Sequence, residues 1–343
     1  MSLRALAPSL FILAAMPALA ATPLSGVRVS SDTTVTLGSV TANDEDVVSD
    51  DLAGNYGLVG VGAIPPETDL DAYAVLPNGD QLLSFDTTVV LSDGHTAHPG
   101  DVWRFHAGAY SVEFDAAARG VPPTANLDAV AVRAGSLLLS FDVAIDLGAV
   151  HVEPADLVLF DGSGFSLYFN GAAAGVPPGL NLDAADYLPC NGHLLVSFDG
   201  SGTIGGVSFD HQDVLEFDGA TWSLAYHPSW GSANLDAVHA TVNFGPGTPL
   251  PFGQTVSADA DKATFRWTTS ADFRMVRGPF ASASDIGTYT VDGTILGTGT
   301  TFIDAATPAP GTGFWYLVKR GGCGPTTWQS ALGLEPGRDT AIP

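Results

Sequence analysis

Regularly spaced aspartates are the residues of this chain that could form a chemical site. The tripeptide Leu-Asp-Ala recurs every 53 to 57 residues and contributes one carboxylate per copy, at Asp71, Asp128, Asp183 and Asp236. Four carboxylates that converge on one axis repel one another unless hydrogen bonds or a cation offset their charge. Hard oxygen ligands favour calcium. The four aspartates are therefore the candidate metal ligands, and calcium is the candidate cofactor.

Two further sets of aspartates recur with the same period, and we call each set of equivalent positions in the repeats a column. One column ends an apolar run of the type LLLSFD, and the other precedes an apolar pair. Their members are Asp32, Asp86, Asp142 and Asp199 in the first column, and Asp46, Asp101, Asp156 and Asp213 in the second. A short carboxylate at a strand end commonly caps backbone amides. We therefore interpret both columns as turn caps, and for the Leu-Asp-Ala column ion binding and capping both stay open.

Histidines mark one loop of the second repeat. The segment HTAH contains His95 and His98, and the aligned loops bring Asn43, Glu153 and Asp210 to the column of His98. The spacing matches no recognised zinc signature. We interpret these side chains as solvated loop residues, with a metal or polar ligand site on one rim as the alternative.

The elements that must position these residues are short strands. Residues 127–181 contain four strand-length runs, LDAVAV, SLLLSFD, DLVLFDG and FSLYFNG, which are separated by Gly, Asn and Pro. They are rich in β-branched and aromatic residues and have no helical periodicity. Four strands in about 50 to 55 residues make one blade of a β-propeller, close to the kelch period.

The two ends of the repeat region complement each other. Three units are complete, whereas the chain enters the array in mid-unit and leaves it with an orphan first strand, LDAVHATVNF, at residues 235–244. One blade stitched from both ends would close the ring and leave no free sheet edge. We predict a four-bladed β-propeller with velcro closure over residues 25–245, and an open stack of repeats is the competing architecture.

The dipeptide Asp-Ala opens each innermost strand of this ring. Together with LDAVAVRAGSLLLSF and ADLVLFDG, it resembles the hemopexin-type propeller over roughly residues 27 to 244. The SFD columns and the GVPP segments lie outside that pattern. The resemblance implies a central channel that holds ions, lined at Asp71-Ala72, Asp128-Ala129, Asp183-Ala184 and Asp236-Ala237.

A second unit follows the repeats. The Gly/Pro segment GPGTPLP predicts a linker, assigned to residues 246–252. Strand-like runs in residues 253–343 predict a small β-sandwich, which makes the whole chain all-β. This part resembles the fibronectin type III-like modules of bacterial secreted proteins, on the pattern of Trp267, Phe314, Tyr316 and Val318. Such modules usually space or anchor other domains.

The acidic composition of the chain excludes two classes of binding partner. The formal net charge of -25 repels phosphate backbones, so nucleic acid and anionic lipid are excluded. Residues 1–20 read as a secretory signal peptide cut after Ala20, with a buried helix as the alternative. No later apolar run approaches the roughly 20 residues of a membrane span. Cys190 and Cys323 are expected as two separate thiols, with an interdomain disulfide as the alternative.

We expect a secreted or cell-surface location, with the periplasm as an alternative. The predicted function is a non-enzymatic binding or surface protein whose partner is an extracellular protein or glycan. An extracellular polysaccharide hydrolase or lyase is the alternative, since carboxylate pairs can do acid and base work. A third hypothesis is structural packing in an extracellular matrix. An enzyme should break the repeat where its unique groups lie, and the repeat is regular, so a binding role is favoured.

Overall fold

The computed structural model describes a long first part of the chain and portions of a shorter second part. The described residues are 21–66, 68–189, 191–242, 257–259, 261, 263–266, 273–282, 291, 293–297 and 301–320. The predicted signal peptide, Cys190, Cys323, the linker and Trp267 lie outside them.

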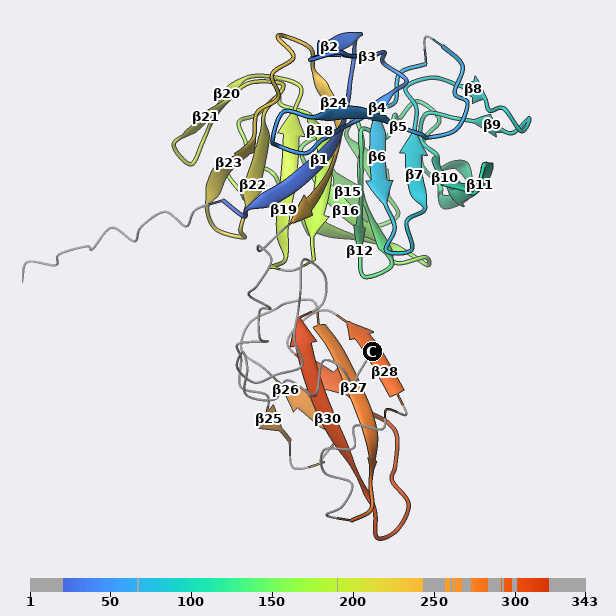
Figure 1. Ribbon diagram of the computed structural model, residues 1–343, viewed down its shortest axis with the longest axis vertical. Helices are drawn as coiled ribbons and strands as arrows, with labels where there is room; N and C mark the ends of the chain where they lie inside the picture. Colours follow the sequence, from blue (N-terminus) through green and yellow to red (C-terminus); the bar gives the residue numbers. More distant parts are fainter. Residues whose placement is uncertain are drawn as a thin grey trace, which may run out of the picture.

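The first part folds into four four-stranded antiparallel sheets, which gather in one body (blue to yellow in Figure 1). One sheet joins the two ends of this part, in the order β24 (Leu235–Val242), β1 (Leu24–Ser31), β4 (Val47–Asp50) and β5 (Tyr56–Val59). The next contains β6 (Ala72–Val75), β7 (Gln81–Ser84), β10 (Val102–His106) and β11 (Ala109–Phe114). The third contains β12 (Ala129–Arg133), β13 (Ser136–Ser140), β16 (Leu157–Phe160) and β17 (Phe165–Phe169). The fourth contains β18 (Leu182–Leu188), β19 (His193–Phe198), β22 (Val214–Phe217) and β23 (Trp222–Tyr226).

Each sheet also carries a short hairpin between its second and third strands, which the sequence patterns did not reveal. The hairpins are β2 (Val35–Leu37) with β3 (Val40–Ala42), β8 (Val89–Val90) with β9 (Thr96–Ala97), β14 (Ile145–Leu147) with β15 (Val150–Val152), and β20 (Gly202–Ile204) with β21 (Val207–Phe209). Strands of two or three residues are too short to show an alternating pattern. A short 3₁₀ helix, Ala117–Arg119, follows β11.

The innermost strands contact one another in a cycle. β6 contacts β12, β12 contacts β18, β18 contacts β24, and β24 contacts β6. Strand β24 also pairs with β1 in antiparallel register, from Leu24 opposite Val242 to Ser31 opposite Leu235. The strand that ends the repeat region therefore belongs to the same sheet as the strand that begins it.

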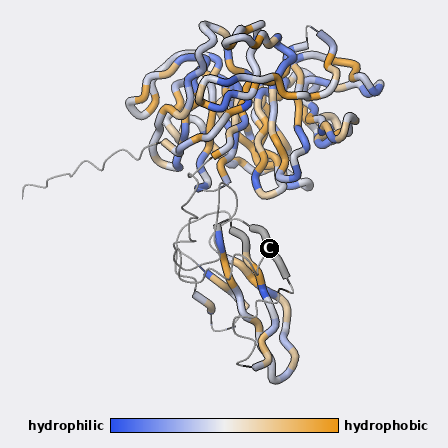
Figure 2. The backbone as a smooth tube through the Cα atoms, viewed as in Figure 1, coloured by the Kyte–Doolittle hydropathy of each residue, from blue (hydrophilic) through white to orange (hydrophobic). Residues whose placement is uncertain are grey.

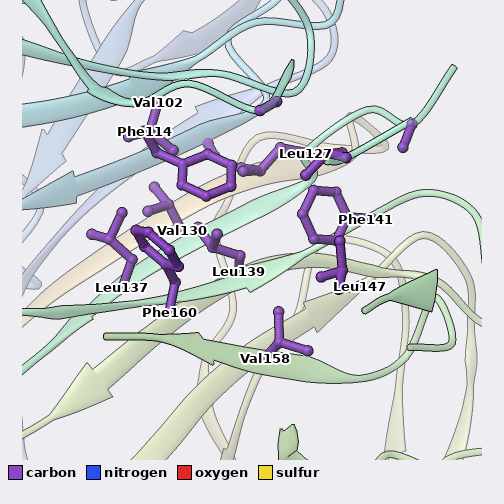
Figure 3. Close-up of a cluster of buried hydrophobic side chains, with 14 of the residues drawn as sticks. Val102, Phe114, Leu127, Val130, Leu137, Leu139, Phe141, Leu147, Val158 and Phe160 are labelled. Atoms are coloured by element: carbon purple, nitrogen blue, oxygen red, sulfur yellow. The ribbon is translucent and has the colours of Figure 1, made fainter. Parts of the chain in front are cut away.

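The hydrophobic core is divided among the interfaces between successive sheets. Figure 3 shows the cluster between the second and third sheets, where Phe114 lies near Val130 and Phe160. The second strand of the third sheet, β13, is buried on both faces, since Leu138 packs into a different cluster from Leu137 and Leu139. This explains continuous apolar runs such as SLLLSF, because neither face of such a strand meets water. Figure 2 shows these apolar stretches along the strands.

The second part contains two three-stranded sheets in its described residues. The first sheet has the order β25 (Ser257–Ala258), β26 (Thr264–Arg266), β29 (Thr301–Ile303), and the second has the order β28 (Gly293–Gly297), β27 (Phe273–Phe280), β30 (Gly313–Arg320). Phe265 of the first sheet and Met275 of the second belong to one buried cluster, which Tyr316 and Val318 cover. The protein is thus all-β, and within the described residues no helix is long and apolar enough to cross a membrane.

Candidate functional site

The four Leu-Asp-Ala aspartates lie at the beginning of the innermost strands. Asp71 and Asp128 immediately precede β6 and β12, and Asp183 and Asp236 are the second residues of β18 and β24. Because these strands contact one another in a cycle, their first residues meet at one end of the four sheets. Asp128 and Asp236 are buried, with 6% and 7% of their surface exposed.

Asparagine amides bridge these carboxylates from one sheet to the next. Asn126 Nδ2 donates to Asp71 Oδ2 and to Asp128 Oδ1, the second bond at 3.1 Å. Asn181 Nδ2 donates to Asp128 Oδ2. Two of the four carboxylates are thus linked through amides that come from the repeat segments immediately before the innermost strands.

The third asparagine repeats this arrangement. Asn234 Nδ2 donates to Asp183 Oδ2, and to Asp236 Oδ1 at 3.2 Å. The fourth equivalent position is Asp69, which carries a carboxylate in place of the amide. We call these eight residues the Asp–Asn ring: Asp69, Asp71, Asn126, Asp128, Asn181, Asp183, Asn234 and Asp236.

The ring contains buried acceptors without donors. Within the described part of the chain, the ring oxygens that have no hydrogen-bond partner are Asp69 Oδ1, Asn126 Oδ1, Asn181 Oδ1, Asn234 Oδ1 and Asp236 Oδ2. A buried polar atom without a partner costs free energy, so such atoms call for an explanation. All five are oxygens that accept and cannot donate in their usual forms, which is the donor set of a hard cation.

Burial raises the pKa of the ring carboxyls. It raises the pKa of Asp71 and Asp128 to about 8 and that of Asp183 to about 7, although the amide of the next asparagine opposes each rise. The pKa of Asp236 rises furthest, to about 10, because burial is joined by repulsion from Asp69 and other carboxylates. Burial, followed by the charge of Asp86, raises the pKa of Asp69 to about 7. At neutral pH the ring therefore holds protons unless a cation replaces them.

The SFD column positions the ring asparagines. In three repeats the aspartate of this column accepts a hydrogen bond from the backbone N–H of a ring asparagine. The pairs are Asp142 with Asn126 at 2.8 Å, Asp199 with Asn181 at 2.9 Å, and Asp32 with Asn234 at 2.9 Å. These carboxylates act as caps, as the sequence predicted, but they cap the start of an adjacent strand of the sheet instead of a local turn.

The third aspartate column caps a loop within each repeat. Each carboxylate accepts the backbone N–H of the residue three positions earlier: Asp46 from Asn43, Asp101 from His98, Asp156 from Glu153 and Asp213 from Asp210. The donors are the residues of the His98 column. That column therefore follows from turn geometry, and the structure does not gather its four side chains with one another.

One group in the described residues has ligand atoms close enough for a metal ion. Asp210, Asp213 and His227 place one ligand atom each within 4.8 Å of one another. Asp213 is already engaged, since its Oδ1 lies 2.6 Å from His227 Nδ1 and its Oδ2 accepts the Asp210 N–H. The Leu-Asp-Ala carboxylates are not brought as close as this, because the asparagine amides lie between them.

Sequence reasoning selected the four ring aspartates and missed the four residues that join them. The signal was present, since Asn-Leu-Asp-Ala occurs three times and Asp-Leu-Asp-Ala once, at residues 69–72. A residue two positions before the aspartate points to the same side of a strand. The exception at Asp69 marks the junction where two carboxylates meet without an amide between them.

The solved structures that the chain matches are β-propeller-like proteins, at TM-scores too low to carry an argument about this chain. No family model matches the chain, and no curated protein matches it. Solved structures include YCF48 bound to D1 peptide, with 9% identity and a TM-score of 0.27, covering 66% of this chain and 64% of that one. YCF48 from Cyanidioschyzon merolae has 7% identity and a TM-score of 0.26, with 66% and 62% covered. An auxiliary nutrient binding protein from Bacteroides ovatus has 10% identity and a TM-score of 0.26, with 71% and 60% covered. The chain thus spans less than two thirds of each, and similarity at this level carries no functional information.

Proposed function

We propose that this chain is a secreted, non-enzymatic binding or cell-surface protein that carries a calcium ion in its Asp–Asn ring. In this proposal residues 25–245 form a closed four-bladed β-propeller, which follows a signal peptide at residues 1–20. Two observations support the closed ring: the cycle of contacts among innermost strands and the pairing of β24 with β1. In such a ring each sheet keeps only a short outer edge strand, β5, β11, β17 or β23.

The five acceptor oxygens without donors carry the calcium proposal. Calcium takes six to eight oxygen ligands from carboxylates, amide carbonyls and water. Asp71, Asp128, Asp183 and Asp236 supply carboxylates, and Asp69 adds a fifth beside Asp236. The junction between Asp69 and Asp236 is the favoured position, because no amide lies between these two carboxylates, and Asp69 Oδ1 and Asp236 Oδ2 have no donor. A calcium ion supplies the charge that offsets their repulsion.

The second part is proposed as a fibronectin type III-like module at residues 253–343, joined by the linker at residues 246–252. Two facing three-stranded sheets with a shared apolar cluster support a β-sandwich. Phe314, Tyr316 and Val318 alternate along β30, the predicted late strand. Such a module would display the propeller at a distance from its anchor, which suits a protein whose partner is an extracellular protein or glycan.

Calorimetric titration of the full mature chain with calcium tests the ring. We expect binding at neutral pH with release of protons, because the ring carboxyls with raised pKa must deprotonate to bind the ion. Asp236→Asn should weaken binding at least tenfold, since it removes one charge from the junction. Asp146→Asn is the matched control, because Asp146 is exposed and lies outside the ring. Equal calcium affinity in Asp236→Asn and wild type, or no binding at all, would overturn the calcium assignment.

The binding role has a separate test. A screen of the mature chain against extracellular glycans and proteins should return at least one ligand that is recovered unchanged. Conversion of a polysaccharide during the screen would instead favour the hydrolase or lyase alternative.

A further inference from the structure

The sheet that joins the two ends of the propeller departs from the repeat at one row of residues. In its register His239 of β24 lies opposite Arg28 of β1, Arg28 lies opposite Ser49 of β4, and Ser49 lies opposite Gly57 of β5. Residues paired in this way point to the same face of a sheet. One charged side chain and one imidazole are thus followed outward by a hydroxyl and a glycine.

Arg28 occupies a position that leucine holds in the other three sheets. The residue of the second strand in this row is Leu82, Leu138 or Leu195, and each of these is 0% exposed. Leucine is the expected residue there, because the second strand is buried between two sheets. The single arginine therefore replaces core packing with a half-buried guanidinium, and partial burial of a charge costs free energy unless hydrogen bonds or a counter-charge offset it.

The guanidinium is held in place by a chain of hydrogen bonds. Arg28 Nη1 donates to Tyr73 Oη at 2.8 Å, and Tyr73 in turn donates to Gln81 Oε1 at 2.8 Å. Gln81 Nε2 donates to the carbonyl of Gly60 at 2.8 Å. Neighbouring strands thus fix the orientation of Arg28 and leave most of its five N–H donors for another partner.

No carboxylate neutralises Arg28 within the part of the chain that the structure describes. Aspartates pair with Arg104, Arg266 and Arg277. The nearby carboxylate of Asp50 is already engaged, since it accepts the Leu52 N–H at 2.7 Å and the Tyr226 hydroxyl at 3.0 Å. The Arg28 guanidinium is thus oriented by Tyr73 and available to an external anion.

A cleft of about 420 Å³ opens over this row, and we call it the Arg28 cleft. Its lining includes Arg28, His239, Ser25, Thr241, Asn55 and Tyr56. The carboxylates of Asp50 and Asp51 also line it, and their oxygens already accept hydrogen bonds from residues 52–55 and from the Tyr226 hydroxyl. The volume lies within the roughly 300 to 1,000 Å³ of small-molecule sites. Hydroxyls, an amide and one aromatic ring suit a polyhydroxylated ligand, because they offer both hydrogen bonds and an apolar surface.

We propose that the Arg28 cleft binds a carboxylate-bearing sugar, a hexuronate unit, whose carboxylate lies on the Arg28 guanidinium. A planar guanidinium binds a carboxylate through two parallel hydrogen bonds. The sugar hydroxyls face Ser25, Thr241 and Asn55. This inference deepens the proposed binding role and names its ligand class. The site is separate from the Asp–Asn ring, since His239 lies about 10 Å along β24 from Asp236 at the ordinary strand rise.

Titration of the full mature chain with sodium glucuronate and digalacturonate, followed by NMR or calorimetry, tests the inference. We expect at least one acidic sugar to bind, and glucose to bind at least tenfold more weakly. Arg28→Leu restores the residue of the other three sheets, so it should fold and lose at least tenfold in affinity. Arg119→Leu is the control, because Arg119 is exposed and lies over Phe160 in another part of the molecule.

A second variant tests the cleft without changing its charge. A Cβ at Gly57 would meet only Ser49 Oγ, at 3.4 Å, so a side chain is tolerated there. Gly57→Leu should fill the cleft and abolish binding while the protein melts as wild type does.

Three results would overturn the inference: no binding of either acidic sugar, unchanged affinity in Arg28→Leu, or acetate binding as tightly as glucuronate. Calcium binding and the wider ligand screen are measured on the same samples. Loss of sugar binding alone therefore refutes the cleft, whereas an empty screen refutes the binding role itself.

Discussion

Replacing Asp69 with asparagine should stabilise the protein when calcium is absent. The other three repeats carry Asn126, Asn181 and Asn234 at this position, and each amide donates to the Leu-Asp-Ala aspartate of the preceding repeat. Asp69→Asn supplies the fourth amide, beside Asp236 Oδ2, which has no donor. The substitution removes one carboxylate from a repelling pair and adds one hydrogen bond, with little change in side-chain volume.

The size of the effect follows from the pKa of Asp69. Burial and neighbouring carboxylates raise this pKa from 3.8 to about 7. Between these two values the folded protein keeps a proton that the unfolded chain has lost, so the free energy of unfolding falls as pH rises. Each pH unit up to the folded pKa lowers the free energy of unfolding by about 1.4 kcal/mol. Asp69 alone therefore contributes a loss of about 3 kcal/mol between pH 5 and pH 8. For a domain of about 220 residues this is a difference of roughly 6 to 12 °C in the melting temperature.

Thermal melts of the full mature chain at pH 5 and pH 8 measure this difference. In chelator, the wild type should melt lower at pH 8 than at pH 5. Asp69→Asn should lose only the part of that difference that Asp69 contributes, because asparagine does not titrate whereas the other four ring carboxyls still do. Calcium at pH 8 should raise the wild-type midpoint, and raise that of the variant less. Asp146→Asn serves as the control and should follow the wild type. A variant that melts at or below the wild type in chelator at pH 8 would show that the ring reasoning is wrong.

Three further predictions concern architecture and capping. Residues 25–245 should fold and stay soluble alone, because the proposed propeller would close on itself; insolubility of this fragment beside a soluble full chain would refute the domain boundary. Deletion of residues 235–244 should unfold the propeller, since it removes β24 and leaves β1 at an open edge; wild-type-like melting would contradict velcro closure. Asp142→Ala should cost about 1 kcal/mol in the free energy of unfolding, because the Asn126 N–H loses its acceptor; chemical denaturation measures it, and no loss would mean that the cap is unimportant.

Much of the fold was predictable because its signals are local. Four runs in residues 127–181 predicted β12, β13, β16 and β17, and these strands form one sheet in that order. Apolar runs and turn residues specify a strand wherever it lies, and the repeat period reports how often the unit occurs. The aspartates Asp46, Asp101, Asp156 and Asp213 were recognised as caps for the same reason, since each accepts the amide three residues earlier in the chain.

Which side chains meet in the Asp–Asn ring and in the Arg28 cleft depends on which repeats become neighbours in space. The amide of Asn126 reaches Asp71, which lies 55 residues earlier in the chain. Asp69 and Asp236 belong to opposite ends of the repeat region, and their repulsion exists only because the ring brings them together.

Arg28 shows most clearly that the sequence alone does not reveal which residues meet between strands. Its sequence context, GVRVSSD, reads as an ordinary strand with one basic residue. Only the register of β1 against β24 and β4 places it where Leu82, Leu138 and Leu195 lie in the other sheets. The sequence by itself determined the strands, the caps and the period, because these depend on neighbours along the chain. The tertiary structure alone decided which carboxylates share an amide and which arginine faces a cleft, because those contacts depend on packing between sheets.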